Sequence, residues 1–209
     1  VAKGTATRFH VSVASYSSRG PALIDNAAKP DLVAPGTGVV SLADPNSLLY
    51  TARAGSLVRG TLPSVTKAYL SLTGTSMAAP MVSGTVALML QANPALTPNL
   101  VKAVLQFTAF DSRSADALTE GAGFLNPRGA VDLVRYFKHA TYGSRYPLSS
   151  SWSQQILWGN YQLSAGVLSP DANAWGSTSC GARRSPATAA TSCGARSAAT
   201  ARTSSGAPI

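Results

Sequence analysis

The feature that most constrains the fold is a run of 17 residues, Ser76 to Ala92, which has helical character and almost no polar side. Large apolar side chains recur along it and small residues separate them: Met81, Val82, Val86, Leu88, Met89 and Leu90, with Ala78, Ala79, Ser83 and Gly84. A helix without a polar face is expected in the interior of a domain. The run is short for a membrane span, which needs about 20 apolar residues, and turn signals flank it. We therefore predict a buried central helix and no membrane segment.

Short apolar segments around this helix predict strands and further helices. Strands are expected at residues 11–15, 31–34, 39–42, 68–72 and 124–125. Thr97 and Pro98 are a typical N-cap and first residue of a helix, and Pro127 begins another that runs to about Phe137. The strand segments lack clean alternation, which suits strands covered on both faces. Strand followed by helix, repeated, predicts an α/β layer fold with a mostly parallel sheet.

The periodicity ends near Tyr142, and Ser, Ala, Thr, Gly and Arg dominate after Trp175. We therefore predict one domain over residues 1–142. Residues 143–209 are expected to be a low-complexity, disordered extension.

The positive charge is concentrated in this extension. The formal net charge is +9, and four arginines without a neighbouring acid lie beyond Gly176: Arg183, Arg184, Arg196 and Arg202. The remainder carries only +5 and shows no basic stripe with interleaved aromatic residues, so no nucleic-acid partner is predicted. Both cysteines, Cys180 and Cys193, also lie in the extension, which excludes a disulfide framework for the domain.

The end of the extension repeats one short peptide. Residues 178–183 and 191–196 both read Thr-Ser-Cys-Gly-Ala-Arg, and residues 203–208 read Thr-Ser-Ser-Gly-Ala-Pro. Codons for all three, read from one nucleotide earlier, can encode Ile-Val-Trp-Gly, which resembles the in-frame residues 156–159. We therefore hypothesise a frameshift near residues 176–178, which would leave Cys180, Cys193 and the terminal arginines without an evolved disulfide, metal or nucleic-acid role. A genuine Ser/Ala/Thr/Arg linker is the alternative.

Sequencing the gene across residues 176–209 tests this hypothesis. We expect the codons of all three repeats to read Ile-Val-Trp-Gly in the neighbouring frame, because one repeated unit then underlies both the in-frame and the shifted peptides. Codons that cannot be read in that way would leave the linker as the explanation.

The segment Gly74 to Pro80 places a serine where a strand turns into the apolar helix. The first N–H groups of a helix have no internal partners and lie at the positive end of its dipole, so they can stabilise a developing oxyanion. Pro80 would lie inside the helix, where its missing N–H breaks a local rule, and such violations gather at functional sites. A serine that only caps its helix is the commoner case, and this reading of Ser76 stays open on the residues alone.

Three ordered motifs resemble the subtilase family of serine peptidases: SYSSRGP at residues 15–21, KPDLVAPG at 29–36 and GTSMAAPMVSG at 74–84. GAGFLNPRGAVD, at residues 121–132, resembles the close of the family's catalytic domain, so the resemblance covers roughly residues 11 to 136. It implies that residues 1–142 are the carboxy-terminal part of a three-layer subtilisin-like fold. It also implies that Ser76 is the nucleophile, that its N–H is one oxyanion donor, and that Gly74 and Thr75 line the same turn.

The resemblance further implies a secreted endopeptidase that cleaves proteins or peptides through an acyl-enzyme on Ser76. Some members bind calcium, but no oxygen-ligand loop is visible, and neither a metal nor a cofactor is predicted. The oligomeric state is left open.

The departures from the family are equally informative. Its aspartate motif, His-Gly-Thr motif and oxyanion asparagine segment all precede SYSSRGP, and none stands in the residues before Ser15. His10 and His139 are poor candidates for the base, and Asp31 is expected to be a structural acid. Without its base a serine is a weak nucleophile, so the chain as it stands is expected to be inactive. The sequence also starts without methionine, so we expect residues before Val1.

Two alternatives remain open. The first is that the chain is a non-catalytic, truncated copy of a peptidase, and the second is that its peptidase part carries a C-terminal binding or export module. Trp-Gly pairs at residues 158–159 and 175–176 favour such a module, but two pairs do not decide it.

Overall fold

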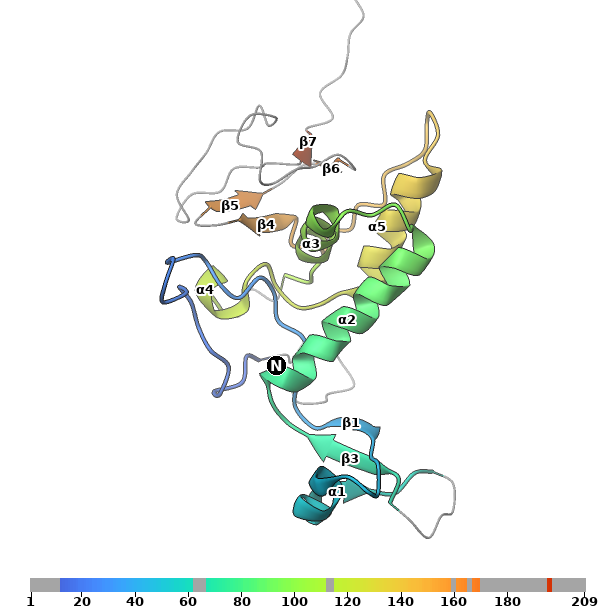
Figure 1. The fold of residues 1–209 in the computed structure, drawn as a ribbon. Coiled ribbons are helices and arrows are strands. Elements are labelled where there is room, and N and C mark those ends of the chain that lie inside the picture. The colour runs from blue at the N-terminus through green and yellow to red at the C-terminus, as the bar shows by residue number, and fades with distance from the viewer. Residues whose placement is uncertain are drawn as a thin grey trace, which may run out of the picture.

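The computed structural model describes residues 12–61, 67–111, 115–158, 161–164, 167–169 and 195–196. His10, Cys180, Cys193 and the proposed frameshift site near residues 176–178 lie outside this part of the chain. In Figure 1 the helices α2 (Thr75–Ala92), α3 (Pro98–Phe107) and α5 (Pro127–His139) form the middle of the molecule. A small sheet lies beside the start of α2, and short strands lie beside α3 on the other side.

The small sheet has the order β1–β3–β2, formed by Val39–Leu42, Tyr69–Leu72 and Leu57–Val58. Both pairings are antiparallel, and Val39 opposes Leu72. Between β1 and β2 the chain turns through α1, Leu48–Ala52, and the 3₁₀ turn Ala54–Ser56. Residues 39–42 thus form the predicted strand, and residues 69–72 most of the one predicted at 68–72.

The sequence predicts a mostly parallel sheet, but every ladder among the described strands is antiparallel. Residues 31–34 and 124–125 meet only through isolated bridges, of which Val33 to Phe124 is parallel. No strand begins within residues 12–15. Val33 and Ala34 are buried, so the missing alternation at 31–34 reflects coverage on both faces and not a long parallel strand. The mixture of helices and strands nevertheless fits the predicted α/β class.

Helices α3 and α5 begin at Pro98 and Pro127, where the sequence predicts. The side chain of Thr97 accepts a hydrogen bond from the Leu100 N–H at the start of α3, Pro98–Phe107. That of Asn126 caps α5, Pro127–His139, in the same way through the Gly129 N–H. A short helix, α4, spans Ala117–Glu120. Proline at the first position of α3 and of α5 sacrifices no hydrogen bond, because the first N–H of a helix has no partner within it.

The apolar helix is α2, Thr75–Ala92, and it is not buried as predicted. Only Thr85 and Met89 are buried, while Leu88 is 51% exposed and Leu90 is 40% exposed. One side of α2 packs on the core beside α5 (Figure 1). Within the described residues no second layer covers the other side, which is why apolar patterning alone misjudged the burial. None of the described helices is both long and apolar enough to span a membrane.

One apolar cluster joins α2, α3 and α5 to the segment that follows them. Its members from the helices include Met89, Leu100, Val104, Phe107, Leu133 and Val134. Trp152, Ile156 and Leu168 belong to the same cluster, and Trp152 meets Phe107 edge to face with ring centroids 6.3 Å apart. Packing therefore continues past the boundary that was predicted at residue 142. Single apolar residues set between polar ones gave no periodic signal there.

The segment after α5 contains short antiparallel pairs. β4, Gln155–Trp158, pairs with β5, Tyr161–Ser164, and β6, Val167–Leu168, pairs with β7, Ala195–Arg196. The hydroxyl of Tyr146 accepts a hydrogen bond from the Leu168 N–H at 3.1 Å and donates one to the Leu168 carbonyl at 3.4 Å. Burial raises the pKa of the Tyr146 phenol well above its ordinary range, so it stays protonated and keeps this donor.

Candidate active site

The candidate nucleophile lies at the start of α2. Gly74 is the N-cap residue and Ser76 is the second residue of the helix, with an exposed side chain. Within the described part of the chain, neither the Ser76 hydroxyl nor its N–H has a hydrogen-bond partner. Since α2 has 18 residues, its dipole adds positive potential at this N–H. The geometry can therefore present a hydroxyl to the carbon of a carbonyl group and one N–H donor to its oxygen.

The turn before Ser76 is held by hydrogen bonds to the chain that precedes β1. The Gly74 N–H donates to the Gly36 carbonyl at 2.8 Å, and the Gly38 N–H donates to the Thr73 hydroxyl at 2.9 Å. The hydroxyl of Tyr16 lies 2.8 Å from that of Thr37 in the same stretch. We call residues 31–38 the connecting segment, and residues 73–76 the nucleophile turn. The orientation of Ser76 thus depends on the connecting segment as well as on α2.

Nothing inside the described chain requires a glycine at position 74. A β-carbon built there would lie 3.6 Å from the Met77 sulfur and 3.9 Å from the Ser76 nitrogen, which are ordinary contacts. Its φ of 160° is close to extended and open to any residue. A glycine at this position leaves room for the backbone of another chain to approach the turn closely.

A pocket of about 310 Å³ opens beside the turn. Thr75, Ala78 and Val82 of α2 line one side, and Ser17, Ser18 and residues 32–34 line the other. The motif GTSMAAPMVSG therefore faces the motifs SYSSRGP and KPDLVAPG across this pocket, although Thr75 lies 41 residues after Ala34 in sequence.

Pro80 lies inside α2 as the sequence predicts. Proline has no N–H, so the carbonyl of Ser76, four residues before it, lacks its usual helical partner. The first turns of α2 are thus less constrained by internal hydrogen bonds than the rest of the helix.

The described residues bring no base to Ser76. His139 is exposed in the last turn of α5, which Figure 1 shows well away from the start of α2. Asp31 pairs instead with Lys29 at 2.8 Å and with Lys102 at 2.9 Å, as expected of a structural acid. Among the described residues no group of three or more His, Cys, Asp or Glu side chains could hold a metal ion.

The comparisons with known proteins decide the family. The family model described as "Subtilase family" matches residues 5–131. The chain belongs to the subtilase family. Subtilases are serine peptidases, so the three ordered motifs identified the family correctly from sequence.

Several subtilase relatives are known by name. The chain is 39% identical over 127 residues to the serine protease AprX of Bacillus subtilis, which covers 61% of this chain and 27% of AprX. It is 36% identical over 146 residues to the subtilisin-like protease SBT1.9 of Arabidopsis thaliana, covering 64% of this chain and 18% of that protein. The chain therefore spans little more than a quarter of the first relative and less than a fifth of the second.

Among solved structures, the chain is similar to fervidolysin from Fervidobacterium pennivorans, described as a keratinolytic enzyme related to subtilisin. The identity is 30%, the TM-score is 0.39, and the match covers 47% of this chain and 14% of fervidolysin.

Sequence reasoning missed the residues that support the site of this subtilase chain. The contacts of Thr73, Gly36 and Gly38 join stretches that no local pattern links. One available signal was Gln106, a polar residue between Leu105 and Phe107 in an apolar helical stripe, and it is fully buried. A buried amide needs hydrogen-bond partners, and such a position therefore indicates a specific polar contact.

Proposed function

We propose that this subtilase chain contributes the nucleophile of a secreted serine endopeptidase, with Ser76 as the attacking residue and proteins or peptides as substrates. The observation that carries the proposal is the exposed Ser76 hydroxyl beside an unpartnered N–H at the positive end of α2. Attack by Oγ on a peptide carbonyl would place the new oxyanion near that N–H, with Gly74 and Thr75 along the same turn.

The proposal assigns the remaining parts of the reaction to residues outside this chain. In the complete enzyme a histidine would take the Ser76 proton and later give it to the leaving amine, oriented by an aspartate. The same enzyme would have the three-layer arrangement with a mostly parallel sheet and a buried α2. The exposed apolar residues Met81, Leu88 and Leu90 on α2 support such a covering layer. The motifs of the peptidase part lie within residues 1–142, and we propose that the extension is frameshifted after about residue 176.

The chain by itself should be close to inactive, because no base lies beside Ser76 in the described residues. We expect no casein hydrolysis above background and no labelling by a fluorophosphonate probe within the time that fully labels an active subtilisin. Ser76→Ala is the matched control for the labelling. Strong labelling of the chain that disappears in this variant would show that a base, such as His10, has been overlooked.

A further inference from the structure

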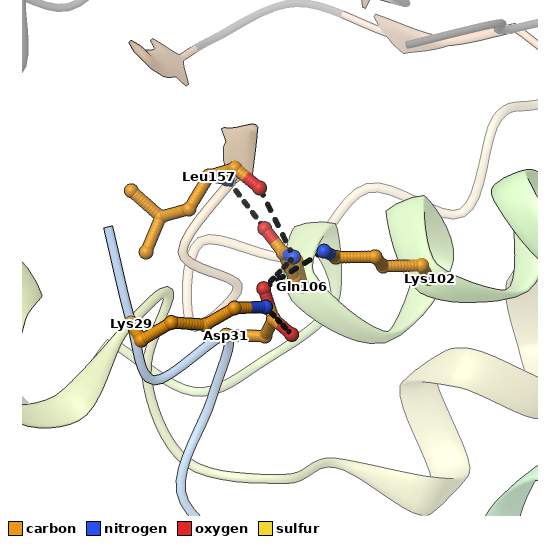
Figure 2. A network of polar contacts seen from close by, with 5 residues as sticks. All are labelled: Lys29, Asp31, Lys102, Gln106 and Leu157. Carbon is orange, nitrogen blue, oxygen red and sulfur yellow. Dashed lines mark hydrogen bonds and ion pairs between the residues drawn. The ribbon is translucent and has the colours of Figure 1, made fainter. Parts of the chain in front are cut away.

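The side chain of Gln106 pairs with the backbone of a segment that lies beyond the predicted domain boundary. Its Oε1 accepts a hydrogen bond from the Leu157 N–H, and its Nε2 donates to the Leu157 carbonyl at 3.3 Å (Figure 2). One carboxamide thus pairs with both backbone groups of one residue, as a neighbouring strand would. Gln106 is fully buried, so these contacts occur away from water, where unpaired polar groups are most costly.

Further backbone contacts dock the same segment along the end of α3. Ser153 N–H donates to the Ala109 carbonyl at 2.7 Å, and Gln154 N–H donates to the Phe107 carbonyl at 3.0 Å. The Ser153 hydroxyl donates to the Gln106 carbonyl at 3.1 Å. We call residues 151–157 the clasp. Its backbone makes most of these hydrogen bonds, and three of its own side chains are buried: Trp152, Ile156 and Leu157.

Gln106 also contacts the connecting segment. Its Nε2 lies 3.4 Å from Oδ1 of Asp31, the oxygen that accepts from Lys102, while Oδ2 accepts from Lys29 (Figure 2). The backbone of Asp31 is fixed as well, because its carbonyl accepts from the Ala122 N–H at 2.9 Å. Asp31 therefore joins the clasp to the start of the connecting segment.

The other end of the connecting segment reaches the nucleophile turn. Val33 exchanges hydrogen bonds with the Gly123 carbonyl and the Leu125 N–H, and Gly36 accepts from Gly74. Hydrogen bonds link Leu157 to Gln106 and Gln106 to Asp31, and the backbone of residues 31–36 then leads to the hydrogen bond between Gly36 and Gly74, the residue that caps α2. A change at the clasp can affect the nucleophile turn through these contacts only if the linked elements open as one cooperative unit.

We propose that Gln106 is a positioning residue: it docks the clasp on α3, and this docking sets the connecting segment that holds the nucleophile turn. The clasp is then an integral part of the peptidase unit. The inference rests on the proposed function in one respect: the position of the turn matters for catalysis only if Ser76 is the nucleophile. The readout below does not require Ser76 to react, so failure of one proposal can be told from failure of the other.

Hydrogen exchange measured on the chain carrying Gln106→Glu tests the coupling. Glutamate has the same shape, but it replaces the amide donor by an oxygen that faces the Leu157 carbonyl and Asp31. We expect amide exchange in residues 152–157 to accelerate roughly tenfold to a hundredfold, and exchange of the hydrogen-bonded amides of Val33, Gly38 and Gly74 to accelerate with it. Faster exchange confined to the clasp would overturn the proposal.

Two controls separate positioning from general loss of stability. Val134→Ala removes volume from the same core and leaves the hydrogen bonds of Gln106 and Asp31 in place. It should not accelerate amide exchange in the nucleophile turn more than in the rest of α2. Gln155→Glu introduces the same charge into β4, where the side chain of Gln155 accepts from Gln162, and it should change exchange in residues 31–38 by less than about twofold. If either control reproduces the Gln106→Glu pattern, Gln106 has no positioning role.

A measurement on the unaltered chain covers the case in which Gln106→Glu does not fold. In rising, sub-denaturing urea, amides that open together converge on one exchange rate. We expect the hydrogen-bonded amides of residues 152–157 and those of Val33, Gly38 and Gly74 to converge on a common rate. Separate openings, with the clasp exchanging well before the turn, would overturn the coupling without any substitution.

Discussion

In a protein that joins this chain to the aspartate and histidine of its family, we expect Ser76→Ala to lower peptide-bond hydrolysis about a million-fold. This is the order of loss on removing the nucleophile of subtilisin, where serine and histidine act as one unit. The measurement is kcat/KM on a peptide substrate. Ser83→Ala is the matched control, since Ser83 is an exposed serine of the same helix whose hydroxyl only donates to the Ala79 carbonyl. We expect its activity to stay within about twofold of the parent, because surface changes of this kind cost little.

One outcome would contradict this prediction. Activity that survives Ser76→Ala would mean that another residue attacks the substrate.

We also expect the gene upstream of Val1 to encode, in order, an aspartate motif, a His-Gly-Thr motif and an asparagine segment. An upstream reading frame for an unrelated domain would favour a non-catalytic copy.

The second large effect concerns stability. We expect Trp152→Ala to lower the free energy of unfolding by about 3–5 kcal/mol, because Trp152 is 7% exposed and packs edge to face on Phe107. A chain ended at residue 142 should lose cooperative unfolding altogether. It would lack Trp152, Ile156 and Leu168 from the core, and such losses together approach the 5–15 kcal/mol that is typical of a whole domain.

Urea unfolding followed by circular dichroism measures both changes. Leu148→Ala is the control, because Leu148 lies in the same segment but is half exposed and should cost less than about 0.5 kcal/mol. A chain of residues 1–142 that unfolds cooperatively, with the midpoint of the full chain, would restore the domain boundary predicted from sequence.

The sequence predicted those parts of the fold that depend on local chemistry. The N-cap Thr97, the prolines that begin α3 and α5, and β1 all follow from residues within one turn or strand. The strand-to-helix turn at Ser76 and its N–H also follow from a short motif. Local propensity is enough in these cases because the contacts that decide them span four residues or fewer.

The sequence could not predict features that depend on which surfaces are covered. An apolar pattern shows that α2 can be buried, but not whether this chain supplies a layer on both of its sides. Trp152 and Leu168 join the core from a stretch without periodicity, so composition placed them in an extension. The contact of Gly74 with Gly36 joins residues 38 positions apart, which no local rule detects.

The pairing of Gln106 with Leu157 restricts the side chain at position 106 more than the side chain at position 157. The hydrogen bonds of the Gln106 side chain to Leu157 use the N–H and the carbonyl of Leu157, and every residue except proline provides both groups. Position 157 can therefore drift among apolar residues that fill the same volume, while position 106 needs a side chain that both donates and accepts at that reach. Relatives that retain the clasp should keep glutamine at 106 and vary freely at 157, and relatives that have lost the clasp should lose this glutamine as well.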